Sequence, residues 1–242
     1  MEYNSPSFPF PIVHLDETES TNNYLRRLCA DGTVEELTTV AADYQTSGRG
    51  QRGNSWEAER GKNLLFSVVL YPTFLEARRQ FLISQIVSLS IKEELERYTD
   101  GVSIKWPNDI YWRERKICGI LIENDLLGRR VSQSVAGVGL NVNQEAFAGS
   151  APNPVSLRQI TGEEHELPSM LRDILLRISA YFEELREGAA DAIADRYKLS
   201  LFRREGTHPY RDADGEFMAR VVDVEPEGRL VLEDVEGSLR RY

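Results

Sequence analysis

An eleven-residue segment rich in glycine and arginine is the clearest candidate for chemistry in this sequence. Residues 46–56 read TSGRGQRGNSW, with three glycines, two arginines and a tryptophan. Neither a helix nor a regular strand favours this composition, so we expect a loop. Arg49 and Arg52, set between flexible glycines, could close over an anion, and Trp56 could offer that ligand a flat face. A solvated basic loop is the plainer alternative that composition leaves open.

Two familiar phosphate-binding motifs do not fit this segment. Its glycines spell G-x-G-x-x-G, but a dinucleotide-binding fingerprint also needs a helix that starts within it and an acidic residue about 20 positions further on. Residues 54–63 have no helical apolar period, and residues 69–75 contain no acidic residue. A P-loop is excluded because no glycine stands five positions before Gly61.

Charged side chains interrupt a later apolar stretch. Residues 103–124 read SIKWPNDIYWRERKICGILIEN, which predicts a strand, a bend, a hairpin and a second strand. Lys105, Asp109 and Lys116 lie at otherwise apolar strand ends. One lysine could neutralise a carboxylate or phosphate while the aspartate accepts a proton, if they face one pocket. Edge charges that discourage sheet pairing are the plainer interpretation. Gly119 indicates close approach of backbone or ligand.

Residues 133–143 form a further apolar strand pattern. Gly137, Gly139 and Asn141 fall on one face because side chains alternate along a strand. The two glycines leave room for something flat on that face. The amide of Asn141 could read the edge of a base or could merely cap the strand end.

Polar groups also lie at the ends of two earlier elements. Ser20 or Thr21 is expected to cap a helix, since an apolar periodic run follows. Hydroxyls beside a helix N-terminus can also bind a polar ligand. Gln45 follows an apolar strand, and its amide both donates and accepts, which suits a ureido or carboxamide group; an exposed strand-end glutamine is the commoner case.

The elements that must position these residues are strands and helices in mixed order. Apolar patterns predict strands over residues 11–15, 37–44 and 63–71 and helices over residues 78–98, 167–185 and 189–199. Residues 216–224 and 229–233 are typical of strands in a small β-barrel. We expect a main domain over residues 1–199 and a C-terminal domain over residues 200–242.

Acidic residues outnumber basic ones, with Asp+Glu 39 against Lys+Arg 29 and a net charge of -10. This balance opposes nucleic-acid binding as the main activity, so a local basic loop suggests a small anionic ligand. The two cysteines have neither metal-ligand spacing nor the density of a secreted scaffold, which favours a reduced, cytoplasmic setting without a metal centre. A secretory leader or membrane span is not expected.

Four segments together resemble one enzyme family. GRGQRGNSW after Gln45, KWPNDIYWRERKICGILIE, GVGLNVN and the earlier Ser20-Thr21-Asn22 occur in the order found in the biotin protein ligases, which attach biotin to a carboxyl carrier protein. The resemblance implies an α+β fold. Its mixed-sheet catalytic domain is of the biotin/lipoate ligase type, like class II aminoacyl-tRNA synthetases, and an SH3-like C-terminal barrel follows. Because the chain ends at Tyr242, we expect that barrel to be incomplete.

The resemblance also assigns roles to residues. It implies a biotin site of Ser20, Thr21, Gln45, Gly48, Arg49, Gly50, Gln51, Lys116, Gly119, Gly137 and Gly139, and an ATP or adenylate site of Arg49, Gln51, Arg52, Trp56, Lys116 and Asn141. Lys116 and Arg49 would neutralise the biotin carboxylate and the phosphate, and Asp109 would help to deprotonate the acceptor lysine. Many members of the family have GRGRxG, whereas Gln51 replaces the second arginine here.

The implied reaction uses biotin, ATP and Mg²⁺, and its partner is the carrier domain of a biotin-dependent carboxylase such as acetyl-CoA carboxylase. We expect no nucleic-acid or membrane partner and a monomer or homodimer. Few residues precede the first predicted strand, so we expect the enzyme-only form without a DNA-binding repressor domain. A lipoate or octanoyl ligase and a non-catalytic biotin-sensing module are the alternatives.

Overall fold

The computed structural model describes residues 8–147 and 153–242, apart from the side chain of Arg52. Its strands are β1 (Ile12–Leu15), β2 (Thr39–Ala42), β3 (Leu64–Leu70), β4 (Val102–Lys105), β5 (Asp109–Trp112), β6 (Arg115–Leu127), β7 (Arg130–Leu140), β8 (His208–Asp212), β9 (Gly215–Val224), β10 (Leu230–Asp234) and β11 (Leu239–Arg241). Its helices are α1 (Thr21–Asp31), α2 (Phe81–Leu95), α3 (Leu157–Thr161), α4 (Leu167–Arg186) and α5 (Ala190–Leu199), with short 3-10 turns at Gln51–Gly53 and Ala77–Arg79.

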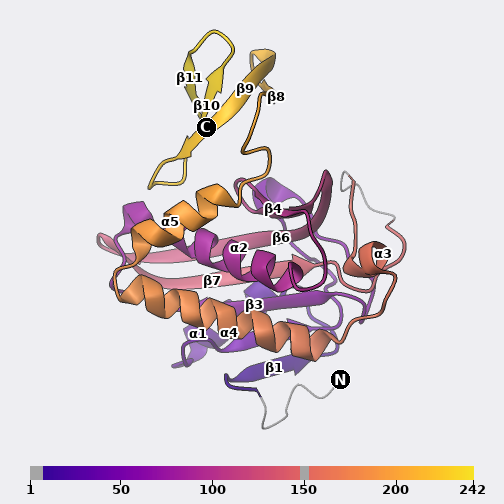
Figure 1. Ribbon diagram of the computed structural model, residues 1–242. Helices are drawn as coiled ribbons and strands as arrows, with labels where there is room; N and C mark the ends of the chain where they lie inside the picture. The colour runs from indigo at the N-terminus through magenta and orange to yellow at the C-terminus, as the bar shows by residue number, and fades with distance from the viewer. Residues whose placement is uncertain (1–7, 148–152) are drawn as a thin grey trace.

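Two β-sheets follow one another along the chain (Figure 1). The larger has seven strands in the order β1-β2-β3-β7-β6-β5-β4, and the smaller has four in the order β11-β10-β9-β8. β1 pairs with β2 in parallel, and the other pairings are antiparallel. The main sheet is therefore mixed, which confirms the expected α+β fold class.

Strand β3 is buried on both faces, and its alternation divides the core in two. Phe66 and Val68 belong to the large cluster formed with α2 and α4, which lie across one face of the sheet (Figure 1). Val69 belongs to a smaller cluster on the other face, with Leu25 of α1 and Val135 of β7. Helix α2 packs between the sheet and helices α4 and α5, which explains why it is apolar nearly all round.

The predicted elements are present, with shifted ends. The helix expected over residues 78–98 begins at Phe81, because residues 77–79 form a separate 3-10 turn. The hairpin of β6 and β7 extends through residues 125–132, which lie between the two strand segments expected from the sequence. Strands β8 and β11 and the short helix α3 were not predicted. Helix α3 has a capping box, in which Ser156 Oγ accepts from the Gln159 backbone N–H and Gln159 Oε1 accepts from the Ser156 backbone N–H, both at 3.2 Å.

The C-terminal sheet is joined to the main sheet at the edge strand β4. Ile104 N donates to Ser200 O and Phe202 N donates to Ile104 O, both at 2.8 Å, so the connecting segment extends that edge. Among the described residues, no ladder joins β8 to β11. Closure of this sheet into a barrel and a domain boundary after residue 199 therefore stay predictions. No helix within residues 8–147 and 153–242 has both the length and the apolar character to cross a bilayer.

Candidate functional site

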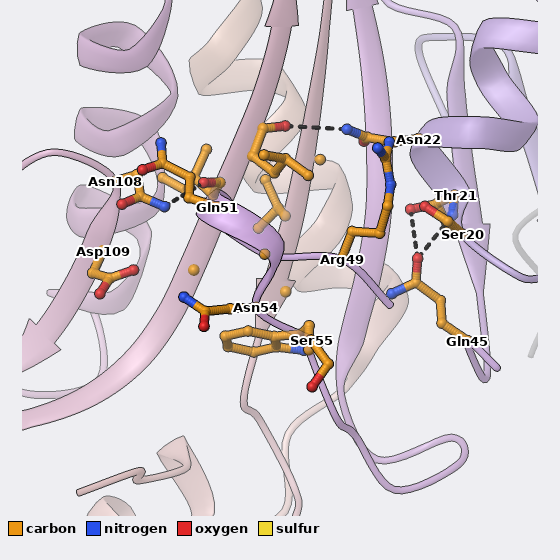
Figure 2. Close-up of a pocket in the computed structure, with 18 of the residues that line it drawn as sticks. Ser20, Thr21, Asn22, Gln45, Arg49, Gln51, Asn54, Ser55, Asn108 and Asp109 are labelled. Atoms are coloured by element: carbon orange, nitrogen blue, oxygen red, sulfur yellow. Dashed lines mark hydrogen bonds between the residues drawn. The ribbon is translucent and has the colours of Figure 1, made fainter. Parts of the chain in front are cut away.

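A cavity of about 270 Å³ lies where the glycine-rich segment crosses the main sheet (Figure 2). Its walls come from the start of α1, the segment after β2, the β4–β5 turn and strands β6 and β7. Twelve of the residues proposed from the sequence line it: Ser20, Thr21, Gln45, Arg49, Gly50, Gln51, Trp56, Asp109, Lys116, Gly119, Gly137 and Gly139. The fold therefore brings together segments that are more than a hundred residues apart.

One end of the cavity is a network of neutral hydrogen-bonding groups. Gln45 Oε1 accepts from the Thr21 backbone N–H at 2.8 Å and lies 3.2 Å from Thr21 Oγ1. The backbone donor fixes the orientation of the amide, so the Gln45 amide nitrogen turns towards the glycine-rich segment (Figure 2). Ser67 Oγ lies 2.7 Å from Thr21 Oγ1 and 2.6 Å from Asn22 Oδ1 and supports both residues from β3. Ser20 is the N-cap residue of α1 as predicted, without a side-chain capping bond.

A carboxylate from β6 links this network to the arginine of the glycine-rich segment. Glu123 Oε2 accepts from Asn22 Nδ2 at 2.9 Å and from Arg49 Nη2 at 2.6 Å. Asn22 is 3% exposed and lies directly over Gly137, where an added Cβ would be 2.1 Å from Asn22 Oδ1. Asn22 belongs to the Ser20-Thr21-Asn22 segment of the family resemblance but was given no role there. Ser67 and Glu123 were not proposed from the sequence, since only long-range contacts reveal their part in the site.

The flat group over the glycines of β6 and β7 is Trp56. Cβ atoms added to Gly119 and Gly139 would lie 2.8 and 2.3 Å from the Trp56 ring, so a side chain at either position would collide with it. The sequence predicted room for a flat group over Gly137 and Gly139; in the structure the Trp56 ring takes this place over Gly119 and Gly139, and Asn22 lies over Gly137. The indole Nε1 of Trp56 is buried without a hydrogen-bond partner among the described residues. This donor is available to a ligand acceptor.

The other end of the cavity carries opposite charges. Lys116 Nζ lies 2.7 Å from Asp109 Oδ1, and the two side chains are about one-fifth exposed, at 21% and 20%. Lys116 Nζ also lies 5.5 Å from the centre of the Trp56 ring. The β4–β5 turn is held against β6, because Asn108 Nδ2 donates to Ile120 O at 2.8 Å. A cation and a proton acceptor therefore face one pocket.

A register shift in the β5–β6 ladder turns Lys116 towards this pocket. Asp109 pairs with Gly119, and Tyr111 pairs with Lys116. Two positions along β5 therefore correspond to three positions along β6. This β-bulge puts Lys116 on the same face as Gly119. Lys105 instead donates to Tyr111 Oη at 2.9 Å and lines a separate cavity beside the C-terminal sheet. Of the two lysines proposed from the sequence, only Lys116 belongs to the site.

Two other proposed residues, Gly48 and Asn141, do not line the cavity. Gly48 packs against the backbone of Trp56. The Gly48 carbonyl accepts from Trp56 N at 2.8 Å, and a Cβ added to Gly48 would be 2.4 Å from Trp56 O. Asn141 is 3% exposed, and its Oδ1 has no partner among the described residues, while its Nδ2 donates to Val155 O at 3.2 Å. The Arg52 side chain lies outside the described part of the chain.

Neither cysteine shows the features of a reactive group. Burial raises the pKa of the Cys118 thiol well above its ordinary value, and the Asp109 carboxylate adds to the rise. Cys118 is fully buried next to Gly119, which confirms it as a core residue, and Cys29 is half-buried against Tyr71.

In the part of the chain that the structure describes, no group of three or more His, Cys, Asp or Glu residues could hold a metal ion.

Comparison with known proteins places this site in a family. The model of the biotin/lipoate A/B protein ligase family matches residues 15–141, which is more than half of the chain. A bifunctional ligase/repressor BirA from Bacillus subtilis is 30% identical over 241 residues, covering 96% of this chain and 72% of that protein. A biotin--[acetyl-CoA-carboxylase] ligase from Mycobacterium tuberculosis is 28% identical, covering 90% of this chain and 81% of that protein.

Solved structures agree with the sequence relatives. A biotin protein ligase from Aquifex aeolicus in complex with biotin and ATP superposes with a TM-score of 0.79 at 27% identity, covering 96% of this chain and 99% of that one. The chain belongs to the biotin/lipoate A/B protein ligase family.

Proposed function

We propose that this protein is an ATP-dependent biotin protein ligase that forms biotinyl-5′-AMP and then transfers biotin to a lysine of a biotin carboxyl carrier protein. The names of the M. tuberculosis relative and of the A. aeolicus complex support this activity. The observation that carries the proposal is the composition of one cavity. Neutral donors and acceptors around Gln45 lie at one end, the Trp56 ring lies over Gly119 and Gly139 in the middle, and Lys116 lies at the other end.

This composition suits a molecule with a neutral hydrogen-bonding head and a carboxylate tail. The amide nitrogen of Gln45 and the hydroxyls of Ser20 and Thr21 would bind the ureido ring of biotin. Lys116 would hold the carboxylate, and its 2.7 Å contact with Asp109 keeps the ammonium in place before substrate arrives. Asn141 Oδ1, which is buried and unpaired, would accept from an amino group of adenine.

In the first step, the biotin carboxylate attacks the α-phosphate of ATP and pyrophosphate leaves. Two anions must approach each other, so the cationic groups of Lys116 and Arg49 lower the barrier by neutralising the charge that concentrates there. Mg²⁺ would come with the triphosphate. Among the described residues that line the cavity, Asp109 is the one carboxylate. One protein carboxylate fits Mg²⁺, which would take most of its other ligands from phosphates and water.

In the second step, the ε-amine of the carrier lysine attacks the acyl carbon, a C–N bond forms, and AMP leaves with the electron pair of the broken C–O bond. A protonated ammonium is no nucleophile, so a base must accept its proton. Asp109, which lines the cavity beside Lys116, would take that role. The glycine-rich segment, with Trp56 beneath it, would keep water from the reactive anhydride. The cytoplasmic location and the oligomeric state stay predictions.

The test is transfer of labelled biotin to the carrier domain of a biotin-dependent acetyl-CoA carboxylase, with and without Mg·ATP. We expect transfer only with ATP, with release of AMP, and no labelling by lipoate or octanoate. Biotin binding without AMP formation would point to the biotin-sensing alternative. Labelling by lipoate in preference to biotin would point to the lipoate ligase alternative.

The neutral Gln51 predicts weak retention of the adenylate. Gln51 lines the cavity where many members of the family have an arginine, so one charge on the phosphate side is missing. Replacing Gln51 with arginine should slow dissociation of biotinyl-5′-AMP about tenfold, the effect of one charge-assisted hydrogen bond. Rapid-mixing chase experiments would measure the rate. Gln51→Met, of similar size and without charge, is the control, and equal rates for Gln51→Arg and wild type would contradict the prediction.

A further inference from the structure

A second cavity, of about 240 Å³, adjoins the main one. The two share Gln51, Asn108 and Ile120 as lining residues. The remaining walls of this side cavity come from the start of α2, from β6 and from the turn between β9 and β10, which supplies Glu227. The side cavity thus opens where the C-terminal sheet meets the catalytic site.

The two cavities differ in charge. The main cavity is lined by the cationic side chains of Arg49 and Lys116, which suit a carboxylate and a phosphate, and by the carboxylate of Asp109, which is paired with Lys116. Glu227 is the only charged residue among the described ones that line the side cavity. Within the described ranges its carboxylate has neither an ion-pair nor a hydrogen-bond partner, although most other acidic side chains of the C-terminal sheet have one. The side cavity therefore suits a cation.

The turn that carries Glu227 is fixed against the catalytic residues. Trp106 lies three residues before Asp109 in the chain, and its indole Nε1 donates to Gly228 O at 2.8 Å. Gly228 has φ +95° and packs so closely on Phe81 that an added Cβ would lie 2.6 Å from Phe81 Cγ. Figure 1 shows this turn at the end of the C-terminal sheet that faces the rest of the protein. Glu227 is thus held at the edge of the site.

We propose that the side cavity admits the acceptor lysine of the carrier protein and that Glu227 binds its ammonium during entry. The apolar walls of Phe81, Ile120 and Ile122 suit the methylene groups of a lysyl side chain, and the carboxylate suits its charged end. The ammonium then passes Asn108 to Asp109, where it loses a proton and attacks the acyl carbon, with AMP leaving. This role rests on the proposed function and makes Glu227 a specificity-determining residue.

The experiment compares Glu227→Gln and Glu227→Lys with wild type. At saturating biotin and Mg·ATP we expect the KM for the carrier domain to rise about threefold in Glu227→Gln, which loses one exposed ion pair with the lysine. We expect a rise of about tenfold in Glu227→Lys, which replaces that attraction with repulsion. Biotin-dependent exchange of pyrophosphate into ATP, which needs no carrier, should stay at the wild-type rate. The salt dependence of carrier kcat/KM should be weaker in Glu227→Gln.

Asp214→Lys is the matched control, because Asp214 is an exposed carboxylate in the β8–β9 turn at the other end of the same sheet. An unchanged carrier KM in Glu227→Lys would overturn the inference, as would an equal rise in Asp214→Lys. A tenfold loss of biotin or ATP affinity in Glu227→Lys would also overturn it, since the cavity would then serve those substrates. Absence of pyrophosphate exchange in wild type would instead overturn the proposed function.

Discussion

Replacing Lys116 with alanine should reduce the rate of adenylate formation by about 10²–10³-fold, the loss typical of removing one preorganised group that stabilises transition-state charge. Lys116 is the only lysine that lines the main cavity among the described residues, and Asp109 Oδ1 holds its ammonium at 2.7 Å. Without this ammonium, the negative charges of the biotin carboxylate and the α-phosphate are less well neutralised as they approach each other. Biotin-dependent pyrophosphate exchange would measure this step without the carrier protein.

Lys105→Ala is the control for this prediction. Lys105 belongs to β4, which is separated from β6 by β5, and it lines the separate cavity beside the C-terminal sheet. Its removal should leave pyrophosphate exchange within about twofold of wild type, as for a surface substitution away from the site. A Lys116→Ala protein that keeps the wild-type exchange rate, or a Lys105→Ala protein that loses it, would contradict the assignment of the catalytic lysine.

Replacing Gly137 with alanine should lower the free energy of unfolding by about 1–3 kcal/mol, the usual cost of an extra methyl in a closely packed interior. The added Cβ would lie 2.1 Å from Asn22 Oδ1. Asn22 cannot move aside freely, because it is 3% exposed and bonded to both Ser67 and Glu123. Displacing it would also disturb the partners of Thr21 and Arg49, so we expect biotin affinity to fall at least tenfold.

Urea unfolding and calorimetric titration with biotin would measure the two effects of Gly137→Ala. Gly32→Ala is the control, because nothing lies within 4 Å of a Cβ added at Gly32, which has an extended φ of -176°. We expect the free energy of unfolding of Gly32→Ala to stay within about 1 kcal/mol of wild type. This substitution changes only the conformational freedom of the unfolded chain and the end of helix α1. A Gly137→Ala protein with unchanged stability and unchanged biotin affinity would show that the Asn22 network is dispensable.

Local patterns in the sequence were enough to find the segments that carry the chemistry. The glycine and arginine composition of residues 46–56 predicted a loop, and these residues cross the cavity. Alternation along residues 133–143 placed Gly137 and Gly139 on one face, and both line the cavity. These inferences succeed because turn chemistry and the two-residue period of a strand depend on neighbours in the chain.

Other parts of the site depend on contacts that no local pattern encodes. Lys116 faces the site because of a β-bulge in the β5–β6 ladder. Lys105 pairs with Asp109 in the β4–β5 ladder, but its ammonium donates to Tyr111 Oη instead. Glu123 joins the site only because the fold brings β6 against α1, about a hundred positions away in the sequence, where Asn22 bonds to it. Sequence spacing indicates which face of a strand a residue shares with its neighbours, but pairing partners and register are set by packing of the whole sheet.

The sequence by itself thus determined the fold class, the family resemblance and most residues of the cavity. Tertiary structure decided which lysine belongs to the site and that Trp56 covers the glycines of β6 and β7. It also brought the turn at Gly228 against the β4–β5 turn through Trp106. The physical reason is that residue types and periodicity are local properties, whereas the meeting of distant side chains follows from strand register and from the packing of one sheet against the other.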